Sequence, residues 1–274
     1  MIAFVNTNLI TCGGIITNYE YVKELRKRGI EANLYANEGN AEMERVYGIK
    51  HTPLSELKTT EKDVIIANRW EQCEDLNKYQ GRKIQFVQGR DTDFYKNHTS
   101  LPQLIATRND PRWELIGVSE YCLQDWGRGT VVPNGINERF FKDYGVERDI
   151  EALVEGNNEP NKNIPYAIEQ AKKDGHQKIV WMGRETCPVE GVETITNPPQ
   201  EEIPKIYQRA KHFYKYSISE GFSLPILEAL LSGCEVHTHD QGHNFPELTK
   251  EYAIRFTWER STNLLLEYLN EIPS

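Results

Sequence analysis

The sequence predicts an α/β protein built from two domains, each with a parallel sheet. Short apolar segments typical of buried strands alternate with segments typical of helices along the 274 residues, and this alternation favours parallel sheets covered by helices. The alternation breaks at residues 139–148 and restarts at Glu151. Because a chain of this length can bury two modest cores, we expect one domain on each side of the break.

The first half reads as a series of strands joined by helices and loops. Strands are predicted at residues 2–5, 31–36, 64–67, 83–88, 115–118 and 130–136. A polar loop at residues 6–14 follows the first strand, and a helix then runs from about Ile15 to Arg28. Gly13 and Gly14 therefore lie at a strand-to-helix turn, where the absence of a Cβ atom lets a ligand approach the backbone.

The second half repeats the pattern. Strands are predicted at residues 151–154, 178–182, 192–195, 212–216, 235–239 and 252–256. Helices are expected after Lys162 up to about Lys173 and from Glu201 to Ala210. A last helix begins at Ser261. Its leucines fall on one side, at positions 264, 265 and 269.

The most informative stretch is residues 217–233, which follows a predicted strand and opens a helix. Pro225 fits the first helical position, and Gly233 fits the residue just past the helix end. The turn before the helix then presents backbone N–H groups that lack intrahelical partners, those of residues 222–224 among them. These donors and the helix dipole predict an anion site suited to a phosphate or diphosphate.

Two glutamates flank this anion site. Glu220 precedes the helix, and Glu228 lies about one turn inside it. An ionised carboxylate only accepts hydrogen bonds, so hydroxyl pairs such as those of a ribose or a hexose are its natural partners. Taken alone, Glu220 is better explained as a solvated loop charge and Glu228 as a partner of the helix dipole. Diphosphate donors beside two hydroxyl acceptors instead describe a pocket for a nucleotide sugar.

Composition and charge exclude several classes of protein. Apolar residues make up 38% of the chain and charged residues 27%, as in soluble globular proteins, and no apolar run approaches the length of a membrane span. The five cysteines are scattered, which indicates reduced thiols and a cytoplasmic protein. A net charge of −9 disfavours nucleic acid as a partner. A basic group in the first predicted helix keeps a peripheral contact with the inner membrane face open, at Lys23, Arg26, Lys27 and Arg28.

Seven residues separate Glu220 from Glu228 in the segment EGFSLPILEALLSG, which resembles the E-x7-E signature of retaining GT-B glycosyltransferases, in particular those of family 4. In that family the first glutamate lies near the donor sugar, the second binds the ribose, and the backbone between them holds the diphosphate. The resemblance therefore assigns these roles to Glu220, to Glu228, and to the backbone of Gly221, Phe222, Ser223 and Leu224.

Other segments extend the resemblance. The motif from Val118 to Phe140, with VSE at its start and VPNGINERF at its end, is similar to the segment that closes the acceptor domain in the family. Gly13 and Gly14 resemble the glycines beside the donor phosphates. The resemblance implies two Rossmann-like domains that face a cleft, at residues 1–142 and 143–258, and a final helix at 259–274 that crosses back to the first domain.

Lys162 is the cation that the resemblance places on the donor diphosphate, because it occupies the lysine of the family motif G-R-x-x-x-x-K. An ammonium there would offset the charge that develops on the leaving group. The arginine of that motif is replaced by Asn157, which supplies a hydrogen bond but no charge. Arg184, at the end of an adjacent predicted strand, is our candidate for the missing cation.

Two further patterns suggest metal binding. Asp91-Thr-Asp93 matches the D-x-D motif of the other major glycosyltransferase fold, but its surroundings resemble a cleft loop of family 4. We therefore expect an acceptor-side role for Gln88, Arg90 and Asp91. His237, His239, Asp240 and His243 also look like a metal cluster, but their spacing favours strand-end and loop residues. We expect no metal and no other cofactor.

The expected activity is metal-independent, retaining transfer of a sugar from a nucleotide-diphosphate donor to a hydroxyl acceptor, a glycan or a glycoconjugate. Three alternatives stay open. They are a non-catalytic nucleotide-sugar binder, a sugar-nucleotide epimerase or phosphorylase, and a DNA-modifying glucosyltransferase, the last disfavoured by the acidic charge.

Overall fold

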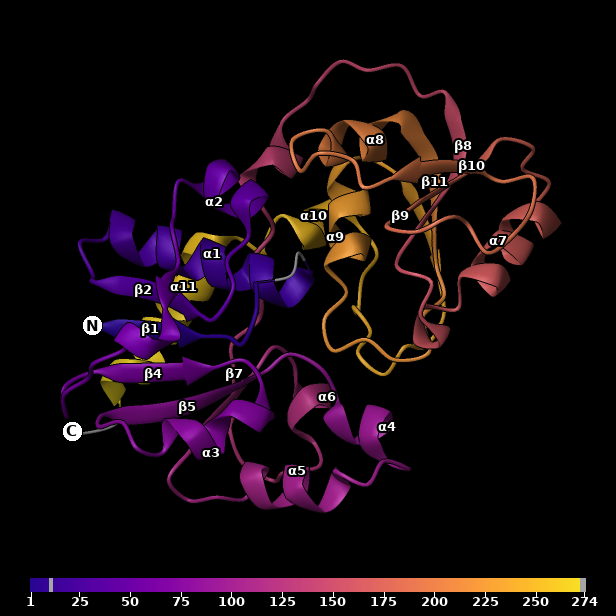
Figure 1. Cartoon of the computed structure of the whole chain (residues 1–274). Helices are drawn as coiled ribbons and strands as arrows, with labels where there is room; N and C mark the ends of the chain where they lie inside the picture. Colours follow the sequence, from indigo (N-terminus) through magenta and orange to yellow (C-terminus); the bar gives the residue numbers. More distant parts are fainter. Residues whose placement is uncertain (10–11, 272–274) are drawn as a thin grey trace. The chain divides into compact units, whose positions relative to one another are not determined.

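The computed structural model describes residues 1–9 and 12–271, which form two compact units (Figure 1). Met1–Gly135 and Trp258–Ser274 make the first unit, and Ile136–Thr257 makes the second. The division after Gly135 lies close to the boundary predicted after residue 142. Residues 10 and 11 of the predicted 6–14 loop, and 272–274 of the predicted last segment, lie outside the described residues.

The first unit is organised around a seven-stranded sheet in which every neighbouring pair of strands is parallel. In spatial order the strands are β3 (Thr52–Pro53), β2 (Ala32–Ala36), β1 (Ile2–Val5), β4 (Val64–Ala67), β5 (Arg82–Val87), β6 (Glu114–Gly117) and β7 (Thr130–Val131). The predicted parallel sheet is therefore confirmed. The strand order reverses between β1 and β4, as in Rossmann-like folds.

Helices and short turns connect these strands, and one further helix near the C-terminus belongs to the same unit. They are α1 (Gly13–Lys27), α2 (Ala41–Tyr47), η1 (Leu54–Glu56), η2 (Trp70–Gln72), α3 (Cys73–Leu76), α4 (Asp91–Tyr95), α5 (Leu101–Arg108), α6 (Glu120–Leu123) and α11 (Trp258–Glu271). The last of these returns from the end of the chain to pack on α1 (Figure 1). The hydroxyls of Tyr21 and Ser261 lie 2.6 Å apart, and the Trp258 ring packs edge-on against Tyr21. The returning C-terminal helix is thus confirmed.

The second unit contains a five-stranded sheet, again with only parallel pairs. In spatial order the strands are β10 (Glu193–Thr196), β9 (Ile179–Gly183), β8 (Ile150–Glu155), β11 (Ala210–Lys215) and β12 (Glu235–Thr238). The connecting elements are η3 (Glu138–Phe141), η4 (Pro160–Lys162), α7 (Ile164–Lys173), α8 (Ile203–Arg209), α9 (Leu224–Leu231) and α10 (Lys250–Ala253). One face of the sheet packs against α7, where Trp181 and Tyr214 are fully buried.

Some predicted elements are wrong. The strand expected at residues 252–256 is instead the end of α10 and a turn, because the Thr249 hydroxyl caps this helix by accepting from the Tyr252 N–H. The strand expected at 130–136 stops at Val131, two residues before Pro133, which has no N–H to donate to a ladder. The cleft loop expected after Arg90 is the short helix α4.

The start of α1 also differs from the expectation. Gly13 and Gly14 form the first turn of the helix, whereas the sequence placed them in the turn before it. Among the described residues, no helix combines the length and the apolar character that crossing a membrane would require.

Candidate functional site

The predicted anion site lies where the strand order of the second sheet reverses. The chain runs from β8 outward to β10 on one side and then returns to β11 and β12 on the other, so β8 and β11 are neighbours with diverging connections. Ligands of open α/β sheets bind at the carboxyl ends of strands at such a reversal. Glu155 ends β8, Lys215 ends β11, and Glu220 follows five residues later.

Gly156 lets the chain turn from β8 toward η4. Its φ of +146° is a conformation that other residues rarely adopt, and a Cβ atom there would lie 3.2 Å from the Ile164 side chain and 3.5 Å from Cβ of Lys162. The close approach brings Lys162, at the end of η4, back over the end of β8. The Ile218 N–H donates to the Asn161 carbonyl at 2.7 Å, which joins this turn to the segment after β11.

Glu220 lies between two lysines. Lys162 Nζ donates to Glu220 Oε1 at 2.9 Å, and Lys215 Nζ lies 3.6 Å from the same oxygen. Lys215 also donates to the carbonyl and the carboxylate of Glu155, both at 3.2 Å. The Lys215 side chain is only 3% exposed, whereas that of Lys162 is 22% exposed. Only Lys162 therefore retains a face that a ligand can reach.

The two lysines set the charge state of Glu220. Burial alone would raise its pKa, but the attraction of Lys215 and Lys162 outweighs burial and holds the pKa below the usual value. Burial likewise disfavours the charged form of Lys215, yet Glu155 and Glu220 raise its pKa above the usual value. Glu220 and Lys215 thus each stabilise the charged form of the other.

The helix after Glu220 follows the predicted pattern closely. Leu224–Leu231 forms α9 with Pro225 in its first turn, and Gly233 follows the helix with φ +79°. The N–H of Leu224 donates to the Phe222 carbonyl at 3.0 Å, so this predicted free donor is already engaged. In the described part of the chain the N–H groups of Phe222 and Ser223 have no hydrogen-bond partner. These two donors remain for an anion.

Glu228 lies in α9 and differs from Glu220 in its charge state. Burial raises the pKa of its carboxyl to about 8, and the nearby Glu155 carboxylate adds to the shift. The sequence predicted an ionised acceptor at Glu228, whereas the raised pKa favours the protonated carboxyl near neutral pH. A protonated carboxyl can donate one hydrogen bond as well as accept.

The other donor-side predictions have different outcomes. Asn157 is half-buried two residues beyond Glu155, in the turn that carries Lys162. Arg184 follows β9, but within the described residues no hydrogen bond or ion pair joins its guanidinium to Glu220 or Glu228. The second cation beside Glu220 is Lys215, which sequence reasoning missed. Its one signal was a lysine directly after the buried residues Phe213 and Tyr214 of the strand.

The predicted acceptor-side residues belong to the first unit. There Gln88 contacts Gly14, which was predicted on the donor side. Gln88, just after β5, donates through Nε2 to the carbonyl of Gly14 in α1 at 3.3 Å. Gly13 is exposed, and its carbonyl accepts from the Thr17 hydroxyl at 2.9 Å. These contacts hold the end of β5 against the first turn of α1.

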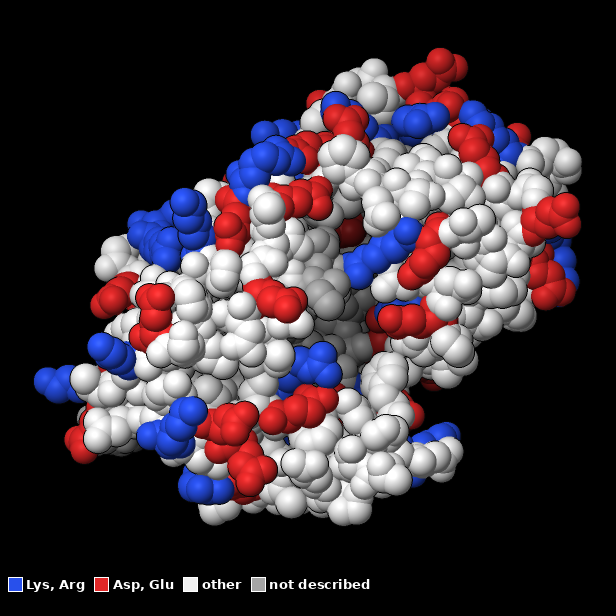
Figure 2. All heavy atoms as spheres, viewed as in Figure 1, with Lys and Arg blue, Asp and Glu red and all other residues white. Residues whose placement is uncertain are grey.

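The charged acceptor-side candidates form ion pairs instead. Arg90 makes two hydrogen bonds to the Asp125 carboxylate, at 2.7 and 2.8 Å. Asp91 pairs with the buried guanidinium of Arg108. The Tyr121 hydroxyl donates to Asp93, so the two carboxylates of the D-x-D pattern contact different partners. On the face drawn in Figure 2, basic and acidic side chains are interspersed.

The chain is similar to known proteins in its structure. No model of a known protein family matches the chain, and no curated protein matches it significantly. Anabaena HepE in complex with UDP-glucose is similar with a TM-score of 0.75 and 12% identity, over 99% of both chains. Sucrose-phosphate synthase from Thermosynechococcus elongatus has a TM-score of 0.74 and 13% identity, over 98% of both chains. WaaG, a glycosyltransferase involved in lipopolysaccharide biosynthesis, has a TM-score of 0.63 and 12% identity, over 98% of this chain and 90% of that one. With its two parallel sheets and these likenesses, the chain has the GT-B fold of glycosyltransferases.

Proposed function

We propose that the protein transfers a sugar from a nucleotide-diphosphate donor to a hydroxyl acceptor and retains the configuration of the anomeric carbon. The observation that carries this proposal is the position of Glu220 between Lys162 and Lys215, at the reversal of the second sheet and directly before α9. The GT-B fold supports it, since HepE, a structural neighbour, was solved with UDP-glucose and with UDP and glucose.

In this proposal the diphosphate lies against Lys162 and the start of α9. An ammonium has three donors, and Lys162 uses one of them on Glu220. The remaining donors, the N–H groups of Phe222 and Ser223, and the dipole of α9 would together bind the phosphate oxygens. Lys215 is buried and engaged by Glu155, so it acts as a positioning residue that keeps Glu220 ionised.

The two glutamates then bind the hydroxyls of the donor. Glu220, ionised and held by two cations, would orient the transferred sugar, and Glu228 would bind the ribose. The bond between the anomeric carbon and the diphosphate oxygen breaks while the acceptor oxygen bonds to the same face of the sugar. The acceptor proton passes to an oxygen of the departing diphosphate. The protein supplies orientation and charge stabilisation and requires no metal at this site.

Product analysis by NMR, with and without an acceptor, tests this proposal. Incubation with nucleotide sugars and a panel of glycan acceptors in excess EDTA should yield a transferred sugar with the donor's anomeric configuration. An inverted product would contradict the retaining mechanism. Loss of turnover that manganese restores would contradict metal independence at the donor site.

Asn157 gives one observation in favour of a second function, a non-catalytic binder of nucleotide sugars, because it stands where the resembled family has an arginine. A binder would take up the donor with neither transfer nor hydrolysis. The substitution Asn157→Arg separates the two functions, since it should raise turnover in an enzyme and leave a binder inactive.

A further inference from the structure

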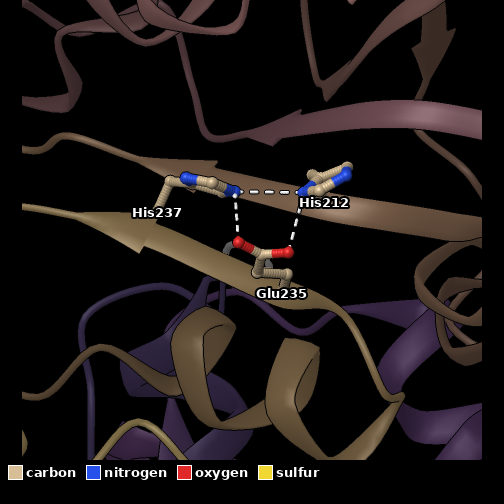
Figure 3. Close-up of side chains that lie close together, drawn as sticks. All are labelled: His212, Glu235 and His237. Atoms are coloured by element: carbon tan, nitrogen blue, oxygen red, sulfur yellow. Dashed lines mark hydrogen bonds and ion pairs between the residues drawn. The ribbon is translucent and has the colours of Figure 1, made fainter. Parts of the chain in front are cut away.

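A second cluster of polar side chains lies on the face of the second sheet opposite Lys215. Alternate residues of a strand point to opposite faces, so His212 and Tyr214 of β11 project away from Lys215, toward the side covered by α7. On the neighbouring edge strand β12, Glu235 pairs in register with His212, and His237 pairs with Tyr214. Figure 3 shows the three side chains His212, Glu235 and His237 converging.

The distances within this cluster fit the coordination sphere of a tetrahedral metal ion. His212 Nδ1 lies 3.1 Å from His237 Nε2 and 3.5 Å from Glu235 Oε2. His237 Nε2 lies 3.7 Å from Glu235 Oε1. A zinc ion about 2.0–2.1 Å from each ligand would hold tetrahedral ligand atoms about 3.3 Å apart. The three measured separations straddle this value.

We propose that His212, Glu235 and His237 bind a divalent transition-metal ion, with Zn²⁺ as the best fit. Imidazole nitrogens and a carboxylate are established zinc ligands, and three protein ligands leave a fourth position for water. The Glu235 side chain is 69% exposed, so solvent reaches the cluster. The ion would join the edge strand β12 to β11 through side chains as well as through the backbone ladder.

The surroundings of His237 hold its ring in the orientation that such a site needs. The Tyr214 ring stacks on it with a centroid distance of 4.3 Å and an interplanar angle of 2°. The Tyr214 hydroxyl donates to Asp174 at 2.7 Å, and the same Asp174 oxygen lies 3.9 Å from His237 Nδ1. At this distance Asp174 makes no hydrogen bond to His237, but it lies on the side where a metal-bound histidine usually has a carboxylate partner.

This inference departs from the sequence prediction, which weighed a different set of residues and expected no metal. Of that set, His239 hydrogen-bonds the Ser217 carbonyl at 2.9 Å, Asp240 accepts from the Gly242 N–H, and His243 stacks on Phe222. Only His237 joins the cluster. The other ligands come from β11 and from the start of β12, so spacing within one segment could not reveal the site.

Equilibrium dialysis against Zn²⁺, followed by metal analysis of the protein, tests the proposal. The full chain should bind one ion, and Zn²⁺ should raise its Tm because the ion binds the folded state more tightly than the unfolded state. Glu235→Gln, at an exposed position, should weaken binding about tenfold or more without unfolding the protein. His237→Ala should abolish binding.

His51→Gln is the matched control. His51 also lies beside a glutamate, Glu44, at 2.5 Å, but this pair belongs to the first unit, whereas the cluster belongs to the second. The control should bind Zn²⁺ as tightly as the wild type. Absence of a bound ion in the wild type, or equal affinity in Glu235→Gln and the wild type, would overturn the proposal. Because the site shares no residue with the Lys162–Glu220 site, either result leaves the proposed transferase function untouched.

Discussion

Lys162 Nζ donates a hydrogen bond of 2.9 Å to the carboxylate of Glu220, the same oxygen that faces the buried Lys215 at 3.6 Å. One carboxylate thus has two cations with different access to solvent. In the proposed function Lys162 contacts the donor, and Lys215 holds the carboxylate ionised. The two lysines should therefore behave differently when each is replaced.

Lys162→Met should weaken donor binding and have a smaller effect on the stability of the fold. The substitution removes a partly exposed ammonium, while Glu220 keeps Lys215 as its partner. Loss of a charged contact to a diphosphate costs about 2 kcal/mol, or roughly thirtyfold in Kd. Calorimetric titration with the preferred nucleotide sugar measures the loss, and an unchanged Kd would show that Lys162 does not contact the donor.

Lys215→Met should mainly lower stability. It removes the buried cation that pairs with Glu155 and leaves Glu220 with Lys162 as its cation, and breaking a buried pair in this way costs about 3 kcal/mol. Urea denaturation measures the change. Lys205→Met is the control, because Lys205 forms an exposed pair with Glu202 whose contribution to stability is small. Equal losses in the two variants would contradict a buried ionic network.

Glu228 should make stability depend on pH. Its pKa is about 8 in the folded protein against a usual 4.5, so between these values the folded state binds more protons than the unfolded state. Wild-type stability should therefore fall as pH rises through this window, by on the order of a few kcal/mol in total. Glu228→Gln cannot titrate and should lack this fall.

The measurement is the free energy of unfolding in urea at a series of pH values. The difference between Glu228→Gln and the wild type should grow with pH up to about 8 and then level off. Glu190→Gln, at an exposed position, controls for changes elsewhere in the protein. Parallel curves for Glu228→Gln and the wild type would contradict the raised pKa.

Gly156→Ala should reduce both stability and donor affinity. The positive φ costs about 1–3 kcal/mol for a residue with a Cβ atom. The new methyl group would crowd the Ile164 side chain at 3.2 Å in the turn that carries Lys162. Gly175→Ala is a matched control, since Gly175 has φ +90° but open space around its Cβ position. Both variants should lose stability in thermal unfolding, but only Gly156→Ala should lose donor affinity. Normal affinity in Gly156→Ala would show that this turn does not position Lys162.

Much of the fold could be predicted from the sequence because its strands are short, apolar and bounded by clear turns. The segments that became β1, β4 and β8 have fully or mostly buried side chains, which local composition reveals. The strand predicted at residues 252–256 failed because its apolar side chains also fit a helix end, where Tyr252 and Phe256 pack against Phe245. Periodicity over so few residues does not separate the two structures.

The candidate site was predictable where it lies in one continuous segment. Glu220, Pro225 and Gly233 follow a local pattern, and their positions agree with it. Lys215 and Glu155 were missed because their importance arises from the pairing of β8 with β11, strands about 60 residues apart in the chain. The raised pKa of Glu228 depends on burial and on Glu155, which the sequence alone does not reveal.

Isothermal titration calorimetry of the wild type against a panel of nucleotide-diphosphate sugars tests the central claim most directly, with the corresponding nucleoside monophosphates as controls. The account predicts saturable binding of at least one nucleotide-diphosphate sugar, weak binding of the monophosphates, and roughly thirtyfold weaker binding of the same sugar by Lys162→Met. Absence of binding for every nucleotide sugar, or identical binding by the wild type and Lys162→Met, would contradict it.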